Sequence, residues 1–259
     1  MRARVLFLLV VAAVSTLKSQ SDKPAIREEQ TVIVDGITET WRLEWKSAPR
    51  RVCGAESANW NTCPCRGFAY GEAGMLDLAR LRNGREIDRL PLTPLFADSD
   101  NLPTNRSGAI LQRWEPQEND SPDSAGLAER VTLRPLVKAM KLADYDHDGA
   151  AAEFFLQTDA EPCGKRMGMV VGLSRGNRRL HAFGSAEKPE APLVLLREAW
   201  EALRDSDGTE ITTWACGDHG ADIESTTRLS TSADGIHIVD REYQCTGNGR
   251  GRLLSETAK

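Results

Sequence analysis

Three aspartates at alternating positions are the strongest chemical signal in the sequence: Asp144, Asp146 and Asp148, followed directly by Gly149. Like charges placed this closely repel one another, and a hard divalent cation at their centre would reverse that repulsion. Oxygen ligands and a glycine that permits a sharp turn favour Ca²⁺ over a transition metal. The pattern therefore predicts a calcium site formed by the three aspartates. The alternative is a solvated acidic turn between two strands.

The segment from Asp144 to Gly149 resembles the D-x-D-x-D-G opening of an EF-hand loop. It departs from that family at the twelfth position, where Phe155 replaces the bidentate glutamate, and the flanking sequence is typical of strands. The segment is more similar to the calcium loops of FG-GAP repeats, which lie between the strands of integrin-type propellers. That family has an acid at the ninth position, which is Ala152 here. The resemblance therefore implies Glu153, one position later, as the closing ligand. The whole chain is also similar to secreted bacterial proteins of uncharacterised function.

A second polar cluster follows Cys216 and contains Asp218, His219 and Asp222 in a glycine-rich turn. These side chains could hold a metal ion or act as a general base in a secreted hydrolase. The sequence contains no phosphate-binding loop, dinucleotide-binding fingerprint, zinc-protease motif or nucleophile-elbow motif. We therefore expect a binding or envelope-associated protein without catalysis, and the hydrolase remains the alternative. A polar loop fixed by a disulfide would also explain the cluster.

The chain has six cysteines, which are Cys53, Cys63, Cys65, Cys163, Cys216 and Cys245. An even number of cysteines in an exported chain is typical of disulfides, and a metal cluster is the alternative. Cys63 and Cys65 are too close to pair with each other, so Cys53 is the expected partner of one of them. Cys216 and Cys245 are the next expected pair. By elimination, Cys163 would join the N-terminal group of cysteines.

The first residues follow the three-part pattern of a secretory signal peptide. Arg2 and Arg4 precede an apolar run over 5–14, and small and polar residues follow up to Gln20. We expect cleavage after residue 19 and a secreted or periplasmic protein with no transmembrane segment in the mature chain. The net charge of −5 lacks the basic excess of nucleic-acid binders. An extracellular protein or glycan is the expected kind of partner.

The rest of the chain predicts a mainly β fold of antiparallel hairpins, sandwich-like or propeller-like, with one substantial helix; an α+β fold is the alternative. We expect a β-rich part over 20–96, a loop or linker over 97–126 and a β-rich part with the helix over 127–259. The two β-rich parts form either one domain or two. The middle segment is predicted as a loop because proline, asparagine, aspartate, serine and glycine dominate it.

Two local patterns give the most specific structural predictions. Asn83-Gly84 is a two-residue hairpin turn that should join strands over Leu76–Arg82 and Glu86–Leu92. A helix is expected over Pro192–Asp205, because four apolar residues within it fall on one face. Further strands are expected over Thr31–Val34, Glu39–Glu44, Phe68–Tyr70, Val131–Leu136, Lys138–Ala143, Phe154–Thr158, Met167–Leu173, Arg179–Phe183, Thr226–Ser230 and Ile236–Tyr243.

Overall fold

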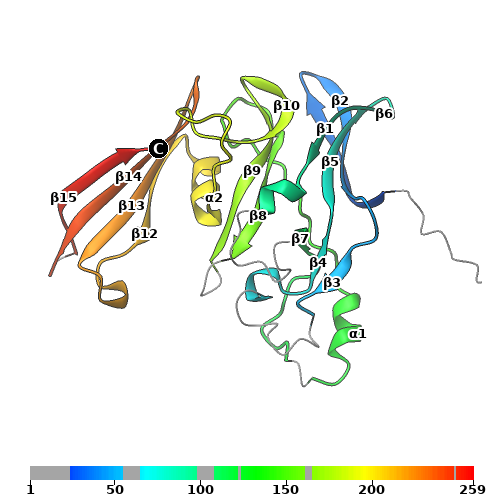
Figure 1. Cartoon of the computed structure of the whole chain (residues 1–259), viewed down its shortest axis with the longest axis horizontal. Coiled ribbons are helices and arrows are strands. Elements are labelled where there is room, and N and C mark those ends of the chain that lie inside the picture. Colours follow the sequence, from blue (N-terminus) through cyan, green and yellow to red (C-terminus); the bar gives the residue numbers. More distant parts are fainter. Residues whose placement is uncertain (1–23, 55–64, 98–107, 122–123, 161–164, 248) are drawn as a thin grey trace, which may run out of the picture.

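The computed structural model describes residues 24–54, 65–97, 108–121, 124–160, 165–247 and 249–259. The expected signal peptide, Cys63 and Cys163 lie outside these ranges. Within them the protein is mainly β, as predicted, with four antiparallel sheets and one helix of seven or more residues. Three of these sheets follow one another along the longest dimension of the molecule, and the smallest sheet lies below the N-terminal one in the view of Figure 1.

The first sheet has the strand order β1-β2-β5-β6 and confirms the predicted hairpin. Its strands are β1 (Ala25–Val34), β2 (Ile37–Trp45), β5 (Leu76–Arg82) and β6 (Arg85–Pro91). Asn83 and Gly84, between β5 and β6, have φ values of 51° and 73°, the positive values that a type I′ turn requires. Alternate residues of β2 point into the core, where Trp41, Leu43 and Trp45 are buried.

A smaller sheet has the order β3-β4-β7 and includes part of the segment expected to be a loop. Its strands are β3 (Arg50–Val52), β4 (Gly71–Gly74) and β7 (Ala109–Gln112), and short 3₁₀ turns cover Cys65–Phe68 (η1) and Thr93–Phe96 (η2). The strand expected over Phe68–Tyr70 is instead the end of η1 and a turn. The strands expected over Val131–Leu136 and Lys138–Ala143 are also wrong. The chain instead forms the short helix α1 (Leu127–Thr132) and then turns. Leu127 and Val131 lie one helical turn apart and are both buried, so the helical spacing decides the structure.

The central sheet is built around β9, which pairs with three strands. It contains β8 (Glu153–Ala160), β9 (Arg166–Ser174), β10 (Asn177–Ala182) and β11 (Leu195–Leu196). The helix α2 (Arg197–Asp205) follows β11 and ends at the predicted residue. It starts later than expected, because Leu195 and Leu196 pair with β9 and are therefore extended. Trp200 of α2 is fully buried, and its indole Nε1 donates a hydrogen bond to the Gly168 carbonyl (3.0 Å).

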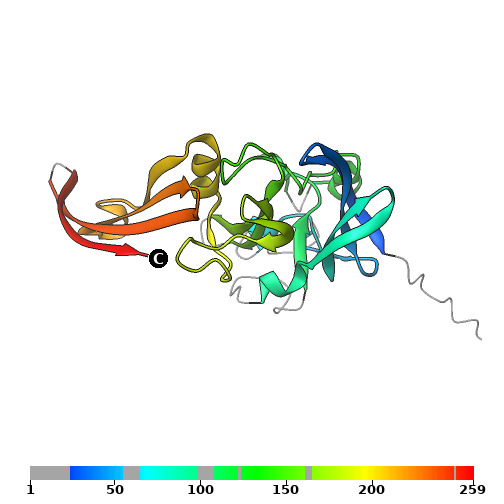
Figure 2. The ribbon, with the colours of Figure 1, turned by 90° about the horizontal axis from the view of Figure 1, so that it is seen from above.

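The C-terminal sheet extends away from the other sheets as a long ribbon (Figures 1 and 2). Its strands, in order, are β12 (Gly208–Trp214), β13 (Ile223–Ser232), β14 (Gly235–Thr246) and β15 (Gly249–Ala258). The strands predicted over Thr226–Ser230 and Ile236–Tyr243 lie in the hairpin of β13 and β14. Its buried residues Leu229, Ile236 and Ile238 pack with Trp200 and Leu203 of α2 in one apolar cluster. The helix therefore connects the ribbon to the central sheet.

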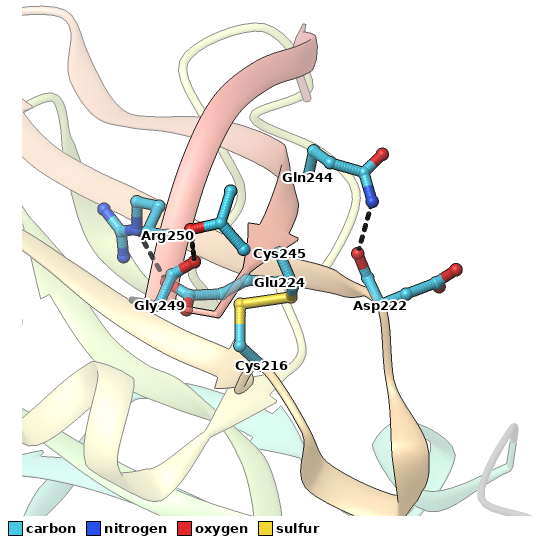
Figure 3. The surroundings of a disulfide bond; sticks show 8 residues. Cys216, Asp222, Glu224, Gln244, Cys245, Gly249 and Arg250 are labelled. Carbon is cyan, nitrogen blue, oxygen red and sulfur yellow. Dashed lines mark hydrogen bonds and ion pairs between the residues drawn. A yellow bond between two sulfur atoms is a disulfide. The ribbon is translucent and has the colours of Figure 1, made fainter.

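Two disulfides occur among the described residues. Cys53 pairs with Cys65, which is one of its two expected partners, and joins the end of β3 to η1. Cys216 pairs with Cys245, as expected, and closes 29 residues of chain. Around this second bond, the Gln244 side chain donates to the Asp222 carbonyl (3.0 Å), and Arg250 pairs with Glu224 (2.6 Å) (Figure 3). The disulfide thus holds the loop after β12 against β14, an inner strand of the ribbon.

Candidate metal site

The acidic loop is closed at its base by a short backbone bridge. Ala143 and Glu153 exchange hydrogen bonds of 2.8 and 3.2 Å, so the chain leaves and returns at the same place. Gly149 has a φ of 92°, which a residue with a Cβ atom rarely adopts. The glycine of the predicted motif therefore makes the turn that it was expected to make. Because Glu153 begins β8, its side chain is fixed beside the loop.

Three carboxylates converge at this position: Asp144, Asp146 and Glu153. One oxygen of each lies within 4.8 Å of the others, so the group could hold a metal ion. Glu153 is 0% exposed and Asp146 is 8% exposed. Glu153 Oε2 accepts a hydrogen bond from the Tyr145 N–H (2.7 Å), whereas the buried Oε1 has no partner among the described residues. A buried carboxylate oxygen without a partner is costly unless a proton or a cation satisfies it.

Backbone N–H groups hold the two aspartates in place. Asp144 accepts hydrogen bonds from the N–H groups of Asp148 (3.0 Å) and Gly149 (2.9 Å). Asp146 accepts one from Asp148 (3.1 Å) and one from Arg175 (2.9 Å), in the turn between β9 and β10. Each carboxylate oxygen has two lone pairs, so these bonds leave acceptor capacity for a cation. The loop therefore orients the side chains before any ion binds.

Asp148, the third aspartate of the motif, makes other contacts. Its Oδ1 accepts a hydrogen bond from the Ala150 N–H (2.9 Å), and its Oδ2 lies 3.4 Å from Arg178 Nη1. It does not belong to the group of oxygens that lie within 4.8 Å of one another. The structure thus places Glu153, implied by the FG-GAP resemblance, with Asp144 and Asp146, while Asp148 stabilises the turn.

Burial and mutual repulsion both oppose the ionisation of these side chains. Burial, together with the nearby carboxylates of Asp146 and Asp144, raises the pKa of Glu153 to about 9, although the hydrogen bond from the Tyr145 N–H opposes this rise. Burial also raises the pKa of Asp146. A divalent cation would remove both penalties, because it neutralises the charges that cause them.

The acidic loop contacts two further parts of the fold. His147 Nε2 donates a hydrogen bond to the Leu203 carbonyl near the end of α2 (2.7 Å). Arg175 donates from its guanidinium to the His147 carbonyl (2.8 Å). The loop therefore links β8, the β9–β10 turn and the helix, so any change in its order should reach all three.

The second polar cluster lies on an exposed loop beside the Cys216–Cys245 disulfide. The side chains of Asp218 and His219 are 47% and 76% exposed, and His219 Nε2 lies 3.6 Å from Asp218 Oδ1. The His219 ring stacks on Trp214 at 5.7 Å between ring centroids. Asp222 is exposed, and its backbone carbonyl accepts the hydrogen bond from Gln244. The contact found within this cluster is thus a long, exposed pair between Asp218 and His219.

Comparison with known proteins gives no relative from which a function could be transferred. No family model, no curated protein and no solved structure matches the chain. Among the described residues, no helix is long and apolar enough to span a membrane. The function must therefore be argued from the site itself.

Proposed function

We propose that this chain is an exported, disulfide-braced β-protein with a binding or envelope-associated role, and that its acidic loop binds a structural Ca²⁺ ion. The unpartnered oxygen of Glu153 carries the calcium proposal. It is fully buried, and it lies in a group with the oxygens of Asp144 and Asp146. Three carboxylates at one point need either protons or a cation, and the ion satisfies all three together.

The chemistry of the donors favours calcium. All three are carboxylate oxygens, which suit hard cations, and no sulfur or imidazole belongs to the group. Ca²⁺ accepts irregular shells of six to eight oxygens, in which water or backbone carbonyls complete the protein ligands. Mg²⁺ requires a nearly ideal octahedron and gives up its water reluctantly. An irregular loop with three carboxylates therefore supports calcium better.

The position of the loop supports a structural role for the ion. Asp146 is bonded to the turn after β9, Glu153 is the first residue of β8, and His147 is bonded to α2. An ion shared by Asp146 and Glu153 would join strands and helix at one point. Export fits this picture, because two disulfides brace the described part and disulfides persist in oxidising compartments.

Calcium binding can be tested by isothermal titration calorimetry on the purified protein. We expect one Ca²⁺ site with a Kd of about 10⁻⁴–10⁻³ M, which is typical of extracellular modules, and weaker binding of Mg²⁺. Asp146→Ala should abolish the calcium heat, because it removes one of the three carboxylates. Asp205→Ala is the matched control, since this side chain is 66% exposed and pairs with its neighbour Arg204. Equal titrations of the protein and of Asp146→Ala would disprove the site.

Export predicts a defined N-terminus on the mature protein. Secreted or periplasmic material should begin at Gln20, because signal peptidase would cleave after the small and polar residues that end the apolar segment. N-terminal sequencing of protein from the medium and from the periplasm measures this directly. Protein that retains Met1 and is found in the cytosol would contradict export.

A further inference from the structure

A cavity of about 320 Å³ lies where the central sheet approaches β7, and Tyr145 is among the residues that line it. β8, β9 and α2 contribute to its wall, together with β7 and the chain over 137–141. In Figure 1, β7 lies beside the lower part of β8, and α2 lies on the other side of β8. The volume falls within the range of small-molecule sites, roughly 300–1,000 Å³.

One part of the cavity wall is apolar. Phe68, Ile110, Leu111, Val137 and Leu156 line it. Ile110, Leu111 and Leu156 belong to strands that are buried in the main core, so this wall is rigid. Such a surface would accept the apolar body of a small molecule.

The other part of the wall is strongly basic. Five basic residues line the cavity, namely Lys138, Lys141, Arg166, Arg197 and Arg204, against two acidic ones, Glu115 and Glu201. Both acidic residues are exposed. An excess of positive charge beside apolar walls raises the local concentration of anions, because the low dielectric of the protein screens the charge poorly.

Arg197 is one of these cations, and no acid among the described residues pairs directly with it. Its side chain is half-buried, and its guanidinium lies over the Phe155 ring at 5.3 Å from the ring centroid. It forms no hydrogen bond or ion pair with any described residue. Burial lowers the pKa of Arg197 and the like charge of Arg166 lowers it further, while three acids at a distance, Glu201, Glu115 and Glu198, oppose this shift without reversing it. Within the described part of the chain, the Arg166 side chain has only a long ion pair, with Glu115 (3.7 Å).

We propose that this cavity binds a small organic anion, with Arg197 and Arg166 holding its head group and the apolar wall holding its body. A guanidinium presents a planar fork of N–H donors that matches a carboxylate or a phosphate. Packing of the Arg197 guanidinium over the Phe155 ring restricts its freedom, and such preorganisation reduces the entropy lost when a ligand binds. The bound anion would supply the counter-charge that the surrounding residues do not supply. This binding requires no ion in the acidic loop, so it stands independently of the calcium proposal.

Calorimetric titration with three eight-carbon probes tests the proposal. Octanoate and octyl phosphate carry the two candidate head groups, and octan-1-ol has the same chain without a charge. We expect at least one of the two anions to bind at a single saturable site, at least tenfold more tightly than the alcohol. The tighter anion identifies the head group. Equal binding of all three probes, or no saturable binding of either anion, would overturn the proposal.

Variants locate the binding in this cavity. Arg197→Gln and Arg166→Gln should each weaken the binding of the preferred anion at least tenfold, and Arg197→Lys should restore part of the loss caused by Arg197→Gln. Arg179→Gln is the control, because this side chain is 86% exposed on β10 and is not among the cavity residues. Circular dichroism confirms that each variant is folded. If Arg197→Gln does not fold, Arg166→Gln decides the question. Unchanged affinity in a folded Arg197→Gln or Arg166→Gln variant would place the anion elsewhere and refute the assignment.

Discussion

Replacing Arg80 with alanine should lower the free energy of unfolding by about 3–5 kcal/mol, the cost of leaving a buried charge without its partner. The Glu39 side chain is 0% exposed, and Arg80 binds both of its oxygens, with Nε at 2.9 Å from Oε2 and Nη2 at 3.0 Å from Oε1. Arg80 also donates to the Arg178 carbonyl (2.8 Å). The substitution therefore removes the main counter-charge of Glu39 and a link between the first sheet and the central sheet.

The loss should depend on pH in a defined direction. Burial alone would raise the pKa of Glu39, but the hydrogen bonds from Arg80, Arg82 and Trp41 outweigh it, so the pKa lies below 4.5. A lowered pKa in the folded state contributes stability that is present above the pKa of the unfolded chain. That stability is lost as the pH falls through the lowered value. Without Arg80 the pKa of Glu39 should rise, so the difference between Arg80→Ala and the original protein should shrink in acid.

Urea unfolding at pH 7 and at pH 4 measures both effects. Arg179→Ala is the matched control, since its exposed side chain should change the free energy of unfolding by no more than about 0.5 kcal/mol. Glu39→Gln combined with Arg80→Ala should recover part of the loss, because the buried charge is then absent. A loss of less than about 1 kcal/mol in Arg80→Ala at pH 7 would show that Arg82 and Trp41 suffice for Glu39.

The parts of the fold that could be predicted are those with a local signal. Asn83-Gly84 determines its hairpin because both residues tolerate positive φ. The end of α2 at Asp205 could be predicted from its apolar stripe. The start of α2 could not be predicted in this way. Leu195 and Leu196 are extended because they pair with β9, and this pairing has no signal in the local sequence. Tertiary pairing overrides a helical pattern in such cases.

The candidate site shows the same division between local and distant information. The turn at Gly149 and the aspartates Asp144 and Asp146 are visible as a motif, and they lie together in the structure. The motif does not show that Glu153 belongs to the carboxylate group while Asp148 lies outside it. Glu153 reaches the group because its backbone bridge to Ala143 places it at the loop. The pair of Arg80 with Glu39 has no local signal at all, because 41 residues separate its partners.

Replacing Glu153 with glutamine should abolish the stabilisation by calcium while leaving the metal-free protein nearly as stable as before. In the absence of an ion, burial keeps the pKa of Glu153 at about 9, so its carboxyl is protonated at pH 7. Glutamine is neutral and has nearly the same shape, and its side-chain oxygen can still accept the hydrogen bond from the Tyr145 N–H. With calcium at a hundredfold excess over Kd, the original protein should gain about 2.7 kcal/mol, and Glu153→Gln should gain almost none.

Thermal melts of both proteins, with calcium and with a chelator, measure this difference, and Asp148→Asn distinguishes the two possible sets of ligands. If the ion is held by Asp144, Asp146 and Glu153, Asp148→Asn should retain the calcium-dependent rise in melting temperature, because Asp148 binds Ala150 and Arg178 instead. If Asp148→Asn loses the rise and Glu153→Gln keeps it, the ligands are the three alternating aspartates of the sequence motif. No rise in the original protein would mean that the loop is an acidic turn held by hydrogen bonds alone. In that case, the proton on Glu153, and no cation, would satisfy its buried oxygen.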